Sequence, residues 1–318
     1  MSQNKKKQKN QTMDINKDWD IVWENASKVY PNGTKGLTDV NLSIKQGEFV
    51  AVIGLSGAGK TTLIKTVNKI SAITSGTLKV GPFIVNDLEG NKLREFRTKI
   101  GIIFQNYNLV ENISVIQNVL SARLPQMNKF RAFFGIYSKK DVELAYQCLA
   151  KVNILENAYD MAKDLSGGQM QRVALARTLA QKPKIILADE PVGALDPIMA
   201  KSVMDGFLIA NKSEKITIVA NLHHVDLALQ YADRIIGVKK GKIIFNDSWD
   251  KVNLEKLKEI YGEKLEQFDK EQFEENRRKR EIVQSEIIKK INKMEHINEK
   301  PITTTKRIPS KTKIRKKS

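Results

Sequence analysis

The chain has 318 residues, of which 41% are hydrophobic, so it is long enough to bury the core of one or two domains. Its formal net charge of +18 indicates either a polyanionic partner (nucleic acid, an anionic membrane surface or phosphate groups) or a basic solvated surface. The single cysteine, Cys148, excludes an intramolecular disulfide, and its apolar-periodic surroundings predict a core position in a reducing compartment.

No run of the sequence approaches the roughly 20 apolar residues that span a bilayer. The polar first residues also lack the apolar region of a signal peptide. We therefore expect the chain to stay in the cytoplasm, where any membrane role would come through a partner.

Composition divides the chain into three parts. Residues 1–17 contain five Lys and one Asp, which predicts a disordered basic extension. Residues 18–262 alternate short apolar runs with longer amphipathic segments, which indicates an α/β domain. Residues 263–318 form a basic tail, which we interpret either as a solvated, dispensable extension or as a segment that binds anionic lipid.

The tail is expected to begin as an amphipathic helix and to become disordered from Lys300 onward. Its apolar residues recur at helical spacing, at Val283, Ile287, Ile291 and Met294.

Apolar runs in the α/β domain predict strands buried on both faces of a sheet, at residues 48–53, 100–104, 185–188, 216–220 and 234–238. Shorter candidates near the start predict a separate antiparallel layer, at residues 40–44, 47–52, 76–80 and 83–85. The strand signal is missing from about residue 106 to 165. Helical spacing at 115–124 and 139–152 predicts a helical insert there.

One motif predicts a phosphate cradle. Its residues fit G-x-x-x-x-G-K-[ST] and lie between the predicted strand 48–53 and a helical run at 62–70: Gly54, Leu55, Ser56, Gly57, Ala58, Gly59, Lys60 and Thr61. The glycines let backbone N–H groups point at phosphate oxygens, and the helix N-terminus adds positive partial charge. Lys60 would reach the β- and γ-phosphates, and the Thr61 hydroxyl would bind Mg²⁺.

Two carboxylates follow the apolar run that ends at residue 188. Asp189 and Glu190 are therefore expected at the carboxyl edge of the sheet, where open α/β folds bind ligands. Asp189 would hold Mg²⁺ through water, and Glu190 would polarise the water that attacks the nucleotide.

A second glycine-rich corner precedes the helical run 170–180 and comprises Leu165, Ser166, Gly167, Gly168 and Gln169. A serine and two glycines at a helix start form another anion-binding corner. The chain would then have two phosphate cradles but one set of catalytic acids. A dimer resolves this, because the corner of one subunit can cover the nucleotide held by the other.

The order and spacing of these three motifs resemble those of the ABC-family ATPases. The resemblance covers about residues 19–262, three quarters of the chain. It implies an α/β P-loop NTPase fold with a RecA-like core, an antiparallel β subdomain and a helical subdomain at about 106–165. It also implies an ATP-binding and ATP-hydrolysing subunit that uses ATP and Mg²⁺ to energise transport.

The resemblance implies further site residues by position. Tyr30 resembles the aromatic residue that stacks on adenine, although an aromatic in a turn-rich segment can also cap the surface. Thr62 joins the ATP-binding set. Gln105 resembles the Q-loop glutamine, which contacts Mg²⁺ and water and senses the permease; otherwise it is a plain loop residue. Asp196 resembles the D-loop aspartate, which crosses the dimer interface.

His223 resembles the switch histidine that contacts the γ-phosphate, and its neighbour His224 is the alternative. We favour His223 because the family histidine comes at this distance beyond its strand. Either histidine could instead be an exposed loop residue.

Within the family, the segments 102–110, 221–229 and 130–137 resemble ATPases of phosphonate-type importers. The solute would then be a phosphonate, or thiamine and its phosphates; the alternative is an exporter or a lipoprotein-release system. Expected partners are a second ATPase subunit, identical in a homodimer, a transmembrane permease and an extracytoplasmic substrate-binding lipoprotein. The chain would be peripheral, at the cytoplasmic face of the membrane.

Four aromatic residues in the helical insert have two interpretations: they contribute to the permease-docking surface or they fill the core of the helical subdomain. They are Phe130, Phe133, Phe134 and Tyr137. ABC-type ATPases that act on ribosomes or DNA usually carry two cassettes or a long coiled coil, and this sequence has neither. We therefore expect no specific nucleic acid partner.

Overall fold

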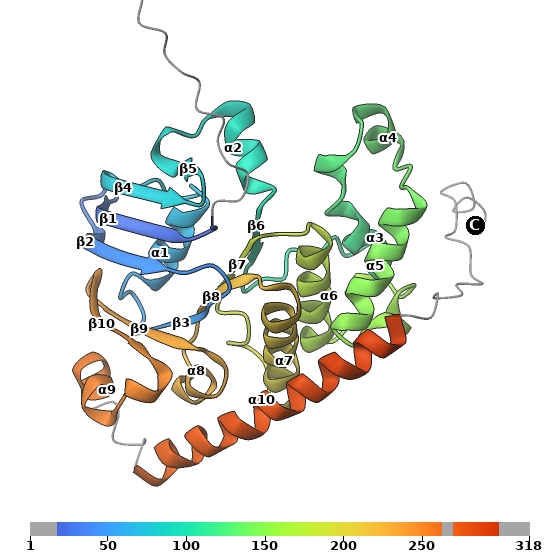
Figure 1. Ribbon diagram of the computed structural model, residues 1–318. Helices are drawn as coiled ribbons and strands as arrows, with labels where there is room; N and C mark the ends of the chain where they lie inside the picture. Colours follow the sequence, from blue (N-terminus) through green and yellow to red (C-terminus); the bar gives the residue numbers. More distant parts are fainter. Residues whose placement is uncertain (1–17, 263–269, 299–318) are drawn as a thin grey trace, which may run out of the picture.

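The computed structural model describes residues 18–262 and 270–298 of the chain (Figure 1). Its larger sheet has the strand order β10-β9-β3-β8-β7-β6, with β10 antiparallel to its neighbour and the other strands parallel. The strands are β3 (Phe49–Ile53), β6 (Ile100–Ile103), β7 (Ile185–Asp189), β8 (Thr217–Asn221), β9 (Arg234–Lys239) and β10 (Lys242–Ser248). The central strands are buried along almost their whole length because helices cover both faces, which explains their continuous apolar sequences.

A smaller antiparallel sheet has the order β2-β1-β4-β5, from β1 (Ile21–Val29), β2 (Lys35–Ile44), β4 (Ser75–Val80) and β5 (Phe83–Ile84). Helix α1 (Lys60–Val67) contacts strands of both sheets, and the indole of Trp23 donates a 3.0 Å hydrogen bond to Thr66 on that helix. The predicted antiparallel layer is therefore present, but the segment 47–52 does not belong to it: these residues enter the large sheet as β3.

The helical subdomain contains α3 (Val115–Ser121), α4 (Lys129–Phe134) and α5 (Lys139–Lys151), followed by α6 (Gly167–Ala180). Helices α3, α5 and α6 pack on one another (Figure 1). Capping boxes fix three of these helix starts, from Ser114 to Gln117, from Ser138 to Asp141 and from Ser166 to Gln169.

The four aromatic residues of the insert separate into two groups. Phe130, Phe133 and Phe134 are 67%, 83% and 55% exposed, so the prediction that they fill the subdomain core is wrong for these three. Helix α4 is six residues long and buries none of them. Tyr137 instead packs, partly buried, against the main core.

The remaining helices are α2 (Gly90–Arg97), α7 (Pro197–Glu214), α8 (Val225–Tyr231), α9 (Leu254–Tyr261) and α10 (Lys270–Asn298). Helix α10 runs along α8 and α7 (Figure 1), and Val283 and Ile287 are buried there. This part of the tail is therefore packed on the domain and not solvated throughout. The predictions for residues 1–17 and for the tail beyond residue 298 lie outside the described residues.

None of the helices within 18–262 and 270–298 is long and apolar enough to cross a membrane.

Candidate nucleotide-binding site

The loop from Gly54 to Gly59 connects the end of β3 to the start of α1. Gly59 has a φ of 109°, and a Cβ atom built there would lie 2.5 Å from the carbonyl oxygen of Gly36. Both the left-handed backbone and the close approach demand glycine at this position. The loop can therefore curl tightly enough to turn its N–H groups inward, at the N-terminus of α1.

Lys60 is buried inside this loop. Its ammonium group donates hydrogen bonds to the carbonyl oxygens of Gly54, at 2.8 Å, and Leu55, at 3.0 Å. Burial lowers the pKa of Lys60, and the carboxylates of Glu190 and Asp189 oppose that shift. The loop carbonyls and the two carboxylates thus keep a cation at the place where phosphate oxygens would bind.

Thr61, Asp189 and Asn221 form a hydrogen-bonded cluster at the carboxyl ends of β7 and β8. The Thr61 hydroxyl donates to Asp189 Oδ1 at 2.8 Å, and Asn221 Nδ2 donates to the same oxygen at 2.8 Å. The amide oxygen of Asn221 is buried and has no hydrogen-bond partner among the described residues. Hydroxyl, carboxylate and amide oxygens are hard ligands of the type that Mg²⁺ prefers.

The part of the chain that the structure describes holds no group of three His, Cys, Asp or Glu side chains that could bind a metal alone. The oxygens of Thr61, Asp189 and Asn221 fit Mg²⁺, which usually takes one or two carboxylates and completes its shell with water and substrate phosphates. Sequence reasoning missed Asn221. The sequence did contain a signal for this residue, because Asn221 is the polar residue that ends the apolar strand β8. It pairs there with Asp189 on β7.

Glu190 contacts His223 across the same sheet edge. Glu190 Oε1 lies 2.6 Å from His223 Nε2, whereas His224 is the N-cap residue of α8. The backbone of Glu190 has a φ of 54°, a conformation that costs of order 1–3 kcal/mol in a non-glycine residue and is concentrated at functional sites. Its N–H donates to the carbonyl oxygen of Asn221 at 3.2 Å, which ties this loop to β8.

Tyr30 and the loop line a cavity of about 210 Å³, together with Thr34, Lys35, Gly36, Thr62 and Glu190. The phenolic oxygen of Tyr30 lies 3.0 Å from the hydroxyl oxygen of Thr62, and its ring packs over Gly36. The structure thus brings Tyr30, which is distant in sequence, to the same cavity as the phosphate cradle.

The second glycine-rich corner lies elsewhere. Ser166 is the N-cap residue of α6, and it exchanges hydrogen bonds with Gln169 at 3.3 Å and 2.8 Å. A Cβ atom at Gly168 would lie within 3.0 Å of the side chain of Met199 on α7, so glycine is required for this packing. None of the five residues from Leu165 to Gln169 lines the Tyr30 cavity. Asp196 caps α7 by accepting from Ile198 and Met199 backbone N–H groups, each at 3.0 Å.

Gln105 follows β6 and is exposed, with no hydrogen bond to another described residue. Because Ile103 pairs with Ala188, Gln105 stands at the same sheet edge as Asp189, but no hydrogen bond joins these two described residues. A residue that sequence reasoning missed holds this loop in place. Arg177 on α6 donates to the carbonyl oxygens of Tyr107, at 3.0 Å, and Asn108, at 2.5 Å.

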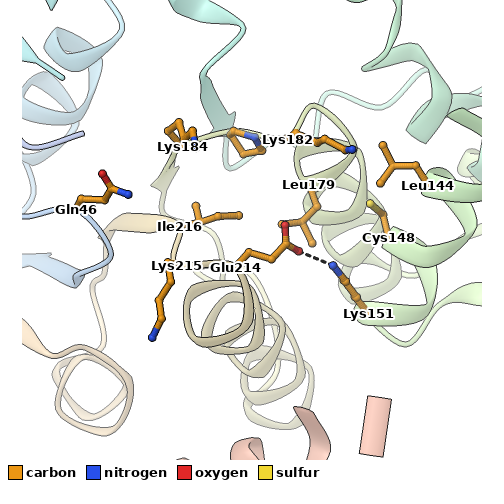
Figure 2. A pocket seen from close by; sticks show the side chains of 11 residues that line it. Gln46, Leu144, Cys148, Lys151, Leu179, Lys182, Lys184, Glu214, Lys215 and Ile216 are labelled. Atoms are coloured by element: carbon orange, nitrogen blue, oxygen red, sulfur yellow. Dashed lines mark hydrogen bonds and ion pairs between the residues drawn. The ribbon is translucent and has the colours of Figure 1, made fainter. Parts of the chain in front are cut away.

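A larger cavity, of about 330 Å³, lies at the opposite edge of the sheet, where β7 and β8 begin (Figure 2). Four of its lining side chains are lysines, and Lys151 pairs with Glu214 at 2.5 Å. Helices α5, α6 and α7 all end at this cavity, and cations are favourable at the negative ends of helix dipoles. The lysines therefore have a structural explanation in the ends of these helices and in the ion pair with Glu214. Cys148 lies here, buried as the sequence predicted.

The parallel sheet, the phosphate-binding loop and the acids at the carboxyl ends of β7 define a P-loop nucleoside triphosphatase. Comparison with known proteins agrees: the sequence profile described as "ABC transporter" matches residues 37–193. A phosphonates import ATP-binding protein, PhnC, of Lactococcus lactis subsp. cremoris is 57% identical over 241 residues, which is 76% of this chain and 98% of that protein. The PhnC of Mesoplasma florum is 52% identical over 247 residues, covering 76% of this chain and 99% of its own.

Solved structures agree as well. The dimeric ATP-binding cassette MJ0796, in a post-hydrolysis state bound to ADP and Pi, has a TM-score of 0.63 and 33% identity, covering 72% of this chain and 98% of its own. The chain belongs to the ATP-binding subunits of the ABC transporter family, and it is an ATPase. The predicted fold class is thereby confirmed.

Proposed function

We propose that this chain energises the import of a small phosphorus-containing solute, of the phosphonate type, from the cytoplasmic face of the membrane. The observation that carries this proposal is the 57% identity, over 98% of its length, to a protein named as a phosphonates import ATP-binding protein. Import by such a system is favoured over export or lipoprotein release because the relatives from Lactococcus lactis and Mesoplasma florum carry that name. Thiamine and its phosphates stay as alternative solutes, since this subunit does not hold the solute.

ATP would bind in the Tyr30 cavity. The adenine ring would stack on Tyr30, and the phosphates would lie in the loop from Gly54 to Gly59, with Lys60 reaching the β- and γ-phosphates. Thr61 and Asp189 would hold Mg²⁺, with Gln105 approaching it from the neighbouring loop. When bound, Mg²⁺ neutralises charge on the phosphate oxygens.

Glu190 would orient the attacking water and accept its proton. The 2.6 Å contact with His223 holds the Glu190 carboxylate beside a group that can donate to the γ-phosphate. Because phosphoryl transfer needs little covalent help from the protein, positioning and charge neutralisation by these residues account for most of the catalysis.

Two copies would close around two ATP molecules. The corner from Leu165 to Gln169 lies outside the cavity of its own chain, so it is free to cover the nucleotide of a second copy. Ser166 and the N-terminus of α6 would then contact the γ-phosphate. Asp196 would lie at the same interface. The related cassette MJ0796 is dimeric, which supports this arrangement.

The closing and opening of the dimer would drive a transmembrane permease. The exposed rings of Phe130, Phe133 and Phe134 provide an apolar surface on the helical subdomain that suits a permease loop. The rings of Phe130 and Phe134 pack against each other in a tilted arrangement, with centroids 4.7 Å apart, which keeps the surface compact. A substrate-binding lipoprotein on the other side of the membrane would supply the specificity for the solute.

Affinity purification of the tagged chain from gently solubilised membranes tests this proposal. A multi-span permease together with a binding lipoprotein is the expected result, and phosphonates should compete for the isolated lipoprotein. A permease with a large extracytoplasmic domain and no binding protein would support export instead. Ribosomal proteins or nucleic acid without a permease would contradict transport.

A further inference from the structure

Helix α10 lies across α8 and α7 as an amphipathic strap (Figure 1). One face of the helix is buried and includes Phe273, Asn276, Arg280, Val283 and Ile287, at alternating steps of three and four residues. The opposite face is exposed; Ile282 and Ile288 are 56% and 55% exposed. The strap is therefore specifically docked through one face.

Arg280 joins the strap to the C-terminal end of α8. Its guanidinium donates to the carbonyl oxygens of Leu229, at 3.3 Å, and Ala232, at 2.6 Å, and pairs with Asp233 at 3.1 Å. The last carbonyls of a helix lack intrahelical partners, so Arg280 satisfies groups that α8 cannot satisfy itself. Arg280 is only 6% exposed and stacks over the ring of Trp249 at 4.5 Å, which restricts it to this position.

Asp205 on α7 connects all three helices. One of its carboxylate oxygens accepts a 2.8 Å hydrogen bond from the hydroxyl of Tyr231 on α8. The other oxygen accepts one of 2.7 Å from Lys290 on α10. A further bond, at 2.7 Å, runs from Gln230 on α8 to Asn276 on the strap. The last turn of α8 is thus bonded to α7 through Tyr231 and to the strap through Gln230 and Leu229.

The other ends of these two helices lead directly into the catalytic loops. Helix α8 begins at Val225, two residues after His223, and α7 begins at Pro197, immediately after Asp196. Helix α8 has only seven residues, too few to be stable without tertiary packing. Its position, and hence that of the His223 loop, depends on the helices packed against it.

We propose that α10 positions α8, and through it His223, for ATP hydrolysis. This inference rests on the proposed role of His223. The strap does not touch the cavity that would hold ATP, since Tyr30, Lys60 and the loop around them come from other elements. Undocking the strap should therefore lower kcat and leave the KM for ATP unchanged.

The match to the PhnC of Lactococcus lactis covers 98% of that protein but 76% of this chain. A related cassette therefore exists in a shorter form. We expect the cassette to stay folded when the strap is undocked.

The chain offers a matched pair of double variants for the test. Val283→Asp with Ile287→Asp places charges on the docked face, and Ile282→Asp with Ile288→Asp places the same charges on the exposed face. Steady-state ATPase assays of the full-length chain, well below the melting midpoint of each variant, should show kcat reduced about 3- to 30-fold in the first and unchanged in the second. Hydrogen exchange in residues 222–232 should accelerate only in the first.

Arg280→Met and Arg278→Met form a second pair, which keeps the apolar stem of each side chain; Arg278 is exposed. The Arg280→Met variant should lower kcat with KM for ATP unchanged, and Arg278→Met should change neither. A lower melting midpoint with normal kcat in both Arg280→Met and the docked-face variant would overturn the proposal and leave the strap a purely stabilising element. If His223→Ala itself keeps normal turnover, the role of His223 fails instead.

Discussion

The carboxylate of Glu190 and the imidazole of His223 lie 2.6 Å apart, although the residues come from loops that follow different strands. The contact is possible because β7 and β8 are adjacent and parallel, so both loops leave the sheet at the same edge. Glu190 also sits in a strained backbone conformation, with a φ of 54°. The pair is therefore the centre of the proposed hydrolytic site.

Glu190→Gln should reduce ATP turnover by about 100-fold or more, because a neutral amide cannot accept the proton of the attacking water. ATP binding should persist, since Lys60 and the loop are untouched. Phosphate release and retention of radiolabelled ATP measure the two effects separately. Normal hydrolysis in this variant would show that Glu190 is not the base.

His223→Ala and His224→Ala distinguish two neighbouring histidines. Only His223 contacts Glu190, so only its removal should lower kcat, by about tenfold or more. His224 caps α8 without a side-chain hydrogen bond, and its variant should hydrolyse ATP at the normal rate. Equal losses in the two variants would argue for a general effect on the loop.

Asn221→Ala should raise the Mg²⁺ concentration needed for half-maximal ATPase activity by about tenfold or more, because Asn221 orients Asp189 and approaches Thr61. Asn211→Ala is the matched control. Asn211 is also a buried asparagine, but it bonds the carbonyl oxygens of Gly47 and Ile216 away from the site. The control should lower the melting midpoint and leave the Mg²⁺ requirement unchanged; a similar Mg²⁺ shift in both variants would contradict a local role.

Asp141→Asn should destabilise the protein in a pH-dependent way. Burial opposes ionisation of Asp141, but hydrogen bonds from Ser138 and Arg123 outweigh it and hold its pKa below the ordinary 3.8. The stabilisation from ionised Asp141 is therefore complete above its unfolded-state pKa of 3.8. It is lost as the pH falls through the lower pKa of the folded state. We expect a loss of about 1 kcal/mol at pH 7, from weakened hydrogen bonds to this side chain, that shrinks in strong acid; urea titration measures it, with exposed Glu143→Gln as the control.

Cys148 should resist alkylation in the folded protein. Burial raises the pKa of its thiol to about 12, so almost no thiolate is present at pH 8. Iodoacetamide labelling should be slow in buffer and fast in concentrated urea, as followed by mass spectrometry. Fast stoichiometric labelling of the folded chain would show that Cys148 is accessible from the cavity beside it.

The phosphate-binding loop could be located from the sequence because its residues are contiguous and steric or chemical requirements determine which residue types can stand at its key positions. Gly59 illustrates this: no other residue fits its φ and its contact with Gly36. The buried strands of the large sheet were equally readable as continuous apolar runs. Strand β1 was not, because Asn25 has a positive φ and register shifts interrupt the alternation of its side chains.

Residues whose roles depend on distant contacts escaped prediction. Arg177 could not be assigned because its partners, Tyr107 and Asn108, lie about 70 positions away in the chain. The apolar stripe around Val283 predicted a helix, but nothing local could say that α8 covers it. The aromatic residues of α4 left two interpretations because exposure depends on the surrounding helices.

Light scattering on the Glu190→Gln chain, with and without Mg-ATP, tests whether two copies share each nucleotide. We expect a species of twice the chain mass, with two ATP per dimer, only when ATP is present. Adding Ser166→Arg should abolish this dimer while ATP still binds, because none of the residues from Leu165 to Gln169 lines the chain's own cavity. A monomer at saturating ATP, or a dimer that survives Ser166→Arg, would contradict this sharing of the nucleotide.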